Sequence, residues 1–179
     1  MSLIGQGTGS QSCQYVTFRV ADLVLGIDVV KVQEVIRYQE MTVVPLAPAS
    51  VEGLINLRGQ IVIAIDARRS LGLPPSRSNV PPMNIVIRSS EGAVSLLVDE
   101  IHDVIDISAS TYAPVPDNMP AEQRALIECV YVLERGLMLV LNVDRVLEGA
   151  SHSSLRFTND SPEHEHSSAD ASQRRFTHV

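Results

Sequence analysis

Short runs of apolar residues recur at intervals of about eight to fifteen residues along most of the chain, and Gly, Pro or Asp separates one run from the next. The runs are rich in Val, Ile and Leu, which favour strands. Such spacing is typical of sheets that close into barrels or sandwiches. Strands are predicted over residues 14–20, 23–27, 60–66, 84–88, 93–99, 104–107, 125–133 and 137–142. We therefore expect a mainly β protein with few short helices.

Two tight turns and one helix complete this prediction. Residues 89–92 and 134–136 are expected to join neighbouring strands as hairpins, because Gly92 and Gly136 can take the positive φ that such turns need. A short helix is predicted over residues 28–35, directly after a strand. There Asp28 can cap the free amides of the first turn, and apolar residues fall on one side.

The apolar runs also carry a weak internal repeat. Leu-Gly-Ile-Asp at 25–28 precedes Glu-Val-Ile, and Leu-Leu-Val-Asp at 96–99 precedes Asp-Val-Ile. Later in each half, a strand ends on Asp66 or Asn142, and Arg and Leu follow at the same offsets. Both copies indicate a strand, a polar N-cap and a short helix. The repeat favours two similar β-rich subdomains, with the proline-rich segment 74–82 running across the surface between or around them; chance similarity among Val-rich strands is the alternative.

The two ends of the sequence lack this pattern. Residues 1–13 are rich in Gly, Ser and Gln, and are predicted to form a flexible leader. Residues 150–179 hold four of the five histidines and are predicted to form a disordered tail. The triplet Arg-Phe-Thr occurs twice there, starting at Arg156 and Arg175, either as a repeated binding motif or by chance. The folded domain is thus expected to span residues 14–149.

Charge and composition argue against several function classes. The formal net charge is −7, and of the 14 basic residues only Lys31 is a lysine, so binding to nucleic acid is not expected. No run approaches the roughly 18 uncharged apolar residues of a membrane span. The first residues do not resemble a signal peptide, so we expect a cytoplasmic protein. Cys13 and Cys129 are then expected to be free thiols.

Candidates for catalysis or metal binding are few. Asp66 at the end of an apolar strand is an aspartic-protease candidate, but Ala-Arg follows it in place of a tight Thr-Gly turn, and a helix N-cap explains it better. His102 lies between Glu100 and Asp103 without a second histidine in the folded part. His164 and His166 fall in the tail. Because nothing beyond these residue types supports an enzyme, an interaction protein without cofactor or metal is favoured.

Three motifs, in a fixed order along the chain, indicate a family. Gly-Ile-Asp-Val-Val-Lys-Val-Gln-Glu-Val at 26–35, Gly-Leu-Ile-Asn-Leu-Arg-Gly-Gln-Ile-Val at 53–62 and Ile-Asp-Ala-Arg at 65–68 resemble the CheW family of chemotaxis coupling proteins. Segments 93–99 and 137–143 resemble the family's later strands. The resemblance covers roughly residues 14–149. It departs from the family pattern at Ile63, where the family often has Pro, and at Ala67, where it has Leu.

The resemblance implies two five-stranded, SH3-like β-barrels side by side. It also implies a non-enzymatic adaptor that is monomeric when free and links the cytoplasmic tip of chemoreceptors to the regulatory domain of a CheA-type histidine kinase. The receptor tip would dock as a helix in an apolar groove. A CheW-like adaptor of another output, such as twitching, gliding or second-messenger control, is the alternative that the sequence leaves open.

The resemblance also assigns site residues. Val32, Glu34 and Arg58 match the family's receptor-side cluster. We expect Arg58 and Glu34 to form an ion pair between a loop and the predicted helix. Val32 is either core or contact. Gly53 and Gly59 are expected to shape the loop through backbone angles that other residues avoid.

Overall fold

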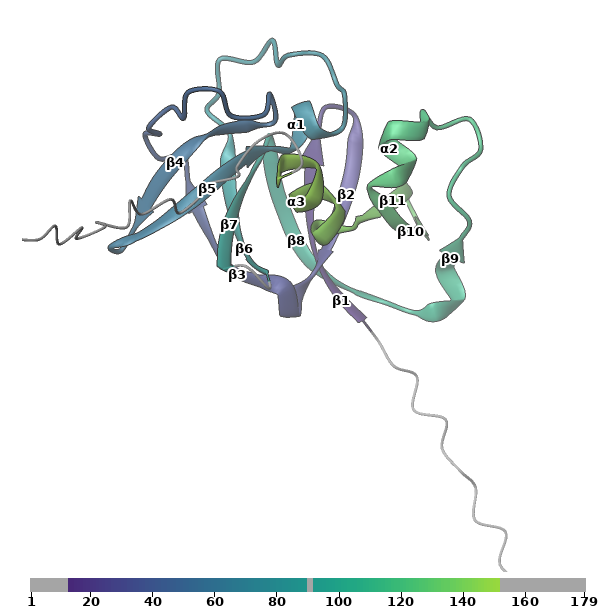
Figure 1. Ribbon diagram of the computed structural model, residues 1–179. Helices are drawn as coiled ribbons and strands as arrows, with labels where there is room; N and C mark the ends of the chain where they lie inside the picture. Colours follow the sequence, from purple (N-terminus) through teal and green to yellow (C-terminus); the bar gives the residue numbers. More distant parts are fainter. Residues whose placement is uncertain (1–12, 90–91, 152–179) are drawn as a thin grey trace, which may run out of the picture.

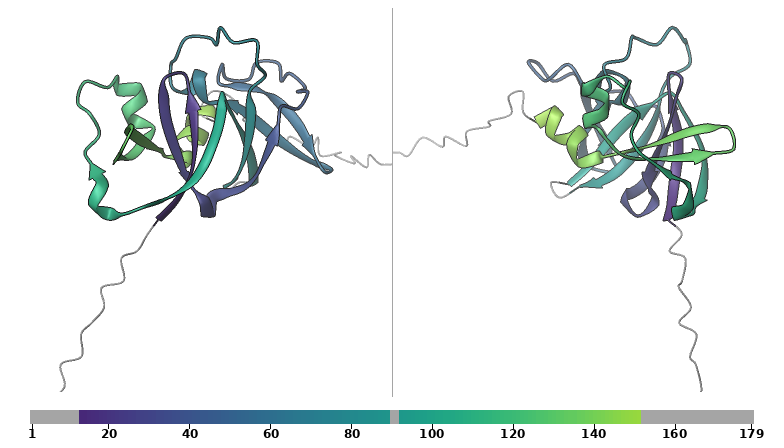
Figure 2. Two further views of the ribbon diagram at one scale, coloured as in Figure 1. Left: turned by 180° about the vertical axis from the view of Figure 1, so that it is seen from behind. Right: turned by 90° about the vertical axis from the view of Figure 1, so that its right-hand side faces the viewer.

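The chain folds into two β-sheets that pack against each other, with three short α-helices (Figure 1). The structure is a computed structural model, and it describes residues 13–89 and 92–151. Figure 1 shows one sheet on the left and the other on the right, and Figure 2 gives the same arrangement from behind and from the side. The predicted mainly β fold is confirmed.

The first five strands of the larger sheet and the five strands of the smaller sheet follow one another in an equivalent order. The six-stranded sheet runs β8 (Glu100–Ile107), β1 (Cys13–Val20), β2 (Leu23–Asp28), β11 (Gly136–Leu141), β10 (Ile127–Leu133) and β9 (Tyr112–Ala113). The five-stranded sheet runs β3 (Val32–Arg37), β6 (Met83–Ser89), β7 (Gly92–Val98), β5 (Gln60–Asp66) and β4 (Val51–Leu57). In each sheet the second and third strands form an antiparallel pair, and the third pairs in parallel with the fourth. The two sheets are therefore structural repeats of one another.

Each repeat gives one strand to the other sheet. The chain passes from β2 in one sheet to β3 at the edge of the other, and from β7 back to β8. The first crossing contains the 3-10 helix η1 (Val29–Lys31). Because of this exchange, neither sheet comes from one continuous half of the chain.

The backbone hydrogen bonds at the ends of β5 and β11 join residues that are the same number of positions apart in the sequence. The amide of Asp66 donates to the Ser50 carbonyl at 2.8 Å, and the amide of Asn142 donates to the Leu126 carbonyl at the same distance. Asp66 then caps α1 (Ala67–Ser70), and the Asn142 side chain accepts from the Arg145 amide in α3 (Val143–Ser151). The predicted succession of strand, polar N-cap and short helix is confirmed in both copies.

The chain that follows each exchanged strand folds back onto the far edge of the same sheet. After β3, Thr42 exchanges two backbone hydrogen bonds of 2.9 Å with Leu54 of β4. After β8, the 3-10 helix η2 (Ala109–Thr111) leads to β9, which pairs with β10. Both sheets are thus drawn towards a barrel, as two SH3-like subdomains require.

Apolar residues fill three layers. The largest cluster lies between the sheets and takes residues from both, among them Phe18, Leu25, Ile65, Ile85 and Leu141. A second cluster lies within the six-stranded sheet and a third within the five-stranded sheet. Alternate residues of strands such as β5 and β11 therefore face different layers, so these strands are apolar on both sides.

The predicted helix over residues 28–35 is wrong. Asp28 does accept a hydrogen bond from the Val30 amide, but the helix ends after one 3-10 turn and Val32–Arg37 is strand β3. Residues of β3 alternate between half-buried and exposed, and the strand pairs with β6. The cap and the valine spacing suit a helix start, but pairing with β6 and the β-branched residues favour a strand.

Other boundaries differ in smaller ways. The strand prediction missed β4 and β9, and Ala125, predicted to begin a strand, ends helix α2 (Ala121–Ala125). Strand β8 is four residues longer at its start than the predicted 104–107. Both predicted hairpins are present, with Ser89 paired to Gly92 and Leu133 paired to Gly136. The predicted leader and tail lie outside the described residues, except that β1 begins at Cys13 and α3 ends at Ser151.

The proline-rich connection between α1 and β6 arches over one end of the two sheets (Figures 1 and 2). Its residues are exposed from Pro74 to Pro81, as the sequence predicts for a surface segment. In the part of the chain that the structure describes, no helix is long and apolar enough to cross a membrane.

Candidate functional site

Arg58 and Glu34 form the predicted ion pair, with Arg58 Nη2 2.8 Å from Glu34 Oε2. Glu34 lies on β3 and Arg58 in the turn after β4, so the pair joins the two edge strands of the five-stranded sheet. The Glu34 side chain is 18% exposed and that of Arg58 is 79% exposed. The guanidinium therefore stands out from the surface while the carboxylate is held beneath it. The pair links a strand to a turn, and not a helix to a loop as predicted.

The turn that presents Arg58 has unusual backbone angles. Arg58 has φ +53° and Gly59 has φ +88°, which is the pattern of a two-residue type I′ hairpin. The Asn56 side chain accepts a hydrogen bond from the Gly59 amide at 2.8 Å and so braces the turn. The φ of Gly59 falls in the left-handed region, which glycine enters without strain.

Gly53 has a different role from the one predicted. Its φ is not in the left-handed region, but a Cβ at this position would lie 2.6 Å from the Thr42 carbonyl oxygen. Glycine is needed there because two backbone segments come close together. Gly53 thus permits the contact that folds the chain after β3 onto β4.

Val32 is half-buried and packs against the large cluster between the sheets. It pairs with Ile87 on β6, whereas Glu34 pairs with Val86, because a β-bulge between Val32 and Glu34 shifts the register. The side chains of Val32 and Glu34 therefore leave β3 on opposite sides. Of the two roles predicted for it, the structure places Val32 at the border of the core. Nearby, Val35 of β3 and Val30 of η1 are exposed, at 42% and 74%.

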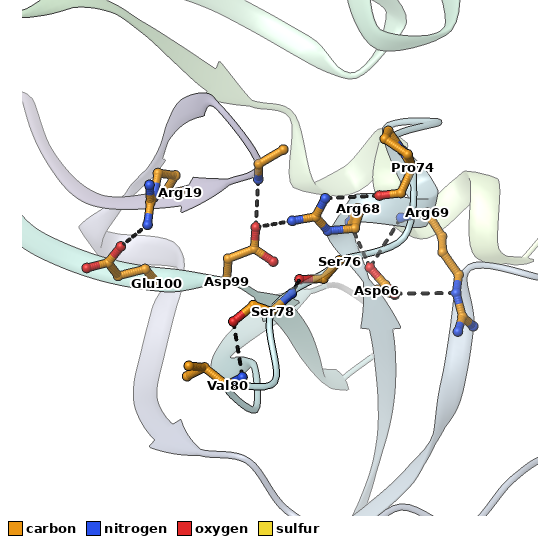
Figure 3. Close-up of polar contacts among 11 residues, drawn as sticks. Arg19, Asp66, Arg68, Arg69, Pro74, Ser76, Ser78, Val80, Asp99 and Glu100 are labelled. Atoms are coloured by element: carbon orange, nitrogen blue, oxygen red, sulfur yellow. Dashed lines mark hydrogen bonds and ion pairs between the residues drawn. The ribbon is translucent and has the colours of Figure 1, made fainter.

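A second polar cluster lies beneath the proline-rich connection (Figure 3). Arg68 of α1 donates to the Asp99 carboxylate and, at 3.0 Å, to the Pro74 carbonyl. Asp99 also accepts a hydrogen bond of 2.6 Å from the Ala21 amide, in the turn between β1 and β2. The Arg68 and Asp99 side chains are only 13% and 27% exposed, so this pair fastens the two sheets to one another.

The sequence did not predict this cluster. Arg68 and Asp99 are 31 residues apart, and neither residue type in its own surroundings indicates the other. The one signal was the repeat, which marked Asp99 as the equivalent of Asp28. Asp28 caps η1 at the first crossing between sheets, whereas Asp99 holds an arginine at the second.

Neither candidate for catalysis has partners suited to it. Asp66 accepts hydrogen bonds from the Arg68 and Arg69 amides as the N-cap of α1. His102 Nε2 lies 3.6 Å from Glu100 Oε2, and both side chains are well exposed. Among residues 13–89 and 92–151, no three His, Cys, Asp or Glu side chains are grouped as a metal site. His164 and His166 lie outside the described residues. Cys13 and Cys129 are free thiols, as predicted.

Comparisons with known proteins agree on one family. The family model for the CheW-like domain matches residues 14–151. The chain is 29% identical over 133 residues to "Chemotaxis protein CheW" of Rhizobium meliloti, covering 74% of this chain and 86% of that protein. It is also 29% identical over 139 residues to the Bacillus subtilis protein of that name, covering 78% and 89%.

A solved structure matches the fold as well. The crystal structure of the scaffolding protein TtCheW from Thermoanaerobacter tengcongensis superposes with a TM-score of 0.69 at 26% identity, covering 76% of this chain and 93% of that one. On these grounds the chain is a member of the CheW-like domain family.

Proposed function

We propose that this protein is a chemotaxis adaptor that couples chemoreceptors to a CheA-type histidine kinase. Membership of the CheW-like family supports this, as do relatives named as chemotaxis proteins and a similar structure described as a scaffolding protein. The observation in this chain that carries the proposal is the Glu34–Arg58 pair, which offers one exposed cation at the rim of a rigid sheet.

The receptor would bind at Val32, Glu34 and Arg58. Glu34 holds the Arg58 guanidinium from one side, and the remaining donors of Arg58 face outward, ready for a carboxylate or carbonyl of a partner. Val30, just before β3, and Val35, within it, are exposed and suit the apolar face of a helix. A helical receptor tip would thus pack its apolar face on the two valines and pair a polar group with Arg58 beside them.

Coupling of this kind needs no chemistry in the adaptor. If the receptor contacts differ between two receptor states, the adaptor shifts the kinase equilibrium by that difference in binding free energy. A rigid body transmits such a difference best, and the buried Arg68–Asp99 pair fixes the two sheets in one relative orientation. The proposal places the protein in the cytoplasm at receptor arrays, as a monomer when free and without enzymatic activity.

The test is a binding titration of the full chain against the receptor tip and, separately, against the kinase regulatory domain encoded nearest its gene. Glu34→Gln and Arg58→Asn each remove one charge, and asparagine tolerates the left-handed backbone of the turn. Both variants are expected to weaken receptor binding several-fold while unfolding stays cooperative. Glu100→Gln is the matched control, because Glu100 forms an exposed pair with Arg19 in the other sheet.

Unchanged receptor affinity for both variants would remove Glu34 and Arg58 from the site. Failure of the unsubstituted chain to bind either partner would contradict the chemotaxis assignment. Binding instead to the kinase and receptor of a motility or second-messenger system would favour the alternative output that the sequence leaves open.

A further inference from the structure

An open cleft of about 1110 Å³ lies under the proline-rich connection, between the two sheets. Its lining includes the Arg68–Asp99 pair together with Ser76 and Ser78 of the connection, and Figure 3 shows the two serines close to this pair. The cleft is separate from the Glu34–Arg58 pair, since neither of those residues lines it. A cavity of this size lies slightly above the usual range of small-molecule sites, about 300–1,000 Å³, and has room for several side chains of a peptide segment.

The cleft carries an excess of negative charge. Five carboxylates line it, and they belong to Asp22, Glu52, Asp66, Asp99 and Glu100. Among the described residues that line the cleft, three carry guanidinium groups to balance them, Arg19, Arg68 and Arg69. Each arginine is already paired within the cleft, with Glu100, Asp99, and Asp66 together with Glu52.

Asp22 is the acidic group left over. It stands in the turn between β1 and β2, and its carboxylate has no hydrogen-bond or ion-pair partner among the described residues. With five carboxylates against three cations, the cleft has room for about two further positive charges. An occupant with two adjacent basic side chains would therefore be favoured there.

Apolar side chains also line the cleft. Val80 of the connection is 73% exposed, and Tyr38 is 42% exposed, although both border the cavity. Leu73 and Pro75 line it as well. An aromatic side chain beside the basic pair would cover this surface and remove it from water.

The sequence of this chain contains such a segment. Residues 174–177 read Arg-Arg-Phe-Thr, two adjacent arginines followed by an aromatic residue. The other copy of the triplet, at 156–158, has Leu155 in place of the first arginine and so brings one positive charge. Charge complementarity selects the later copy.

Helix α3, which precedes this segment in the chain, lies near the cleft. Helix α3 contacts α1, and its Val146 and Gly149 line a hollow whose wall includes Arg69, a residue that also lines the cleft. Twenty-three residue steps separate Ser151 from Arg174. With random-coil statistics, 23 residue steps have an average end-to-end span of about 24–29 Å, comparable to the width of a domain of this size. We propose that residues 174–177 dock in this cleft of the same chain, with both arginines on the carboxylates and Phe176 against Val80 and Tyr38.

The experiment uses the full chain with Cys13→Ala, Cys129→Ala and Ser172→Cys, labelled with a nitroxide at the new thiol. Paramagnetic broadening of backbone amide NMR signals reports which residues the label approaches. Broadening at Asp22, Ser78 and Val80 is expected to exceed several-fold that at Gly59 and Gly136, whose turns do not line the cleft. Salt at 1 M should abolish the difference, because exposed charges are then screened within a few ångströms.

Two variants of the labelled chain locate the contact. Arg174→Glu with Arg175→Glu is expected to remove the broadening at the cleft. The matched control, Arg156→Glu with Phe157→Ala, is expected to leave it in place. Neither change touches a residue of the described fold, so loss of folding cannot imitate loss of docking.

Three results would overturn the proposal: equal broadening at the cleft and at the two distant turns, loss of broadening in the control variant alone, or undiminished broadening when spin-labelled chains without ¹⁵N are mixed with ¹⁵N-labelled chains that carry no spin label. The last result would mean that the segment binds a second copy. The outcome is independent of receptor and kinase binding, so failure here leaves the proposed adaptor function standing.

Discussion

The backbone at Gly53 lies against that of Thr42, so that a Cβ on Gly53 would stand 2.6 Å from the Thr42 carbonyl oxygen. Thr42 cannot move aside, because its amide and carbonyl both bond to Leu54. We therefore expect Gly53→Ala to lower the free energy of unfolding by about 1–3 kcal/mol, the usual cost of overpacking. Urea unfolding followed by circular dichroism measures this loss.

The control for this prediction is Gly149→Ala. Gly149 lies in α3 with no atom within 4 Å of the position its Cβ would take. Alanine there should raise the free energy of unfolding, by up to about 1 kcal/mol from helix propensity. Equal losses at both glycines would show that the contact with Thr42 does not limit position 53.

Arg58 is expected to contribute to binding and not to stability. Its left-handed backbone costs a non-glycine residue about 1–2 kcal/mol, whereas its exposed ion pair with Glu34 contributes about 0–1 kcal/mol. Arg58→Gly should therefore unfold at the same or a slightly higher urea concentration. Arg58→Val, a β-branched residue at the same φ, should unfold at a lower one. A marked loss of stability in Arg58→Gly would mean that the ion pair outweighs the strain.

Much of the fold follows from local patterns in the sequence. Strands β5 and β6 contain unbroken apolar runs, and hairpin turns with Gly92 and Gly136 fix the pairing of β6 with β7 and of β10 with β11. The pattern failed at β3, where Asp28 and the valine spacing suit a helix. Only pairing with β6, some fifty residues later, makes that segment a strand.

The site was harder to predict than the fold. Glu34 and Arg58 are 24 residues apart, and no local rule couples them; the family resemblance alone brought them together. The cluster around Arg68 and Asp99 was missed for the same reason. Close approach at Gly53 depends on Thr42, whose own place depends on the closing of the sheet.

Asp66 and Asn142 should contribute comparable stability, because they cap equivalent helices. Asp66 accepts from the Arg68 and Arg69 amides, and Asn142 from the Arg145 amide. Replacing either by alanine is expected to lower the free energy of unfolding by about 0.5–2 kcal/mol. Asp66→Asn and Asn142→Asp retain a capping oxygen and should lose much less. Equal losses for Asp66→Ala and Asp66→Asn would assign the effect to charge and not to capping.

Glu100 is expected to make stability depend on pH in the acid range. The hydrogen bond and charge of Arg19 hold the pKa of the Glu100 carboxyl below its ordinary value of 4.5. A lowered pKa in the folded state stabilises the fold above about pH 4.5, and this stabilisation is lost as the pH falls through the folded pKa. The difference in unfolding midpoint between wild type and Glu100→Gln should thus shrink as the pH falls from 6 to 3. A difference that stays constant over this range would contradict the ion pair.

The two thiols are expected to react at very different rates. Cys13 is exposed, whereas Cys129 is half-buried, and burial raises the pKa of the Cys129 thiol. Because the thiolate is the reacting form, a smaller fraction of Cys129 than of Cys13 is reactive at pH 8. The half-buried thiolate of Cys129 is also less accessible to a reagent. Reaction with a chromogenic disulfide should show a fast and a slow phase of equal size. Cys13→Ala should remove the fast phase and Cys129→Ala the slow one. A single phase in the wild type would mean that β10 becomes accessible to the reagent faster than the thiols react.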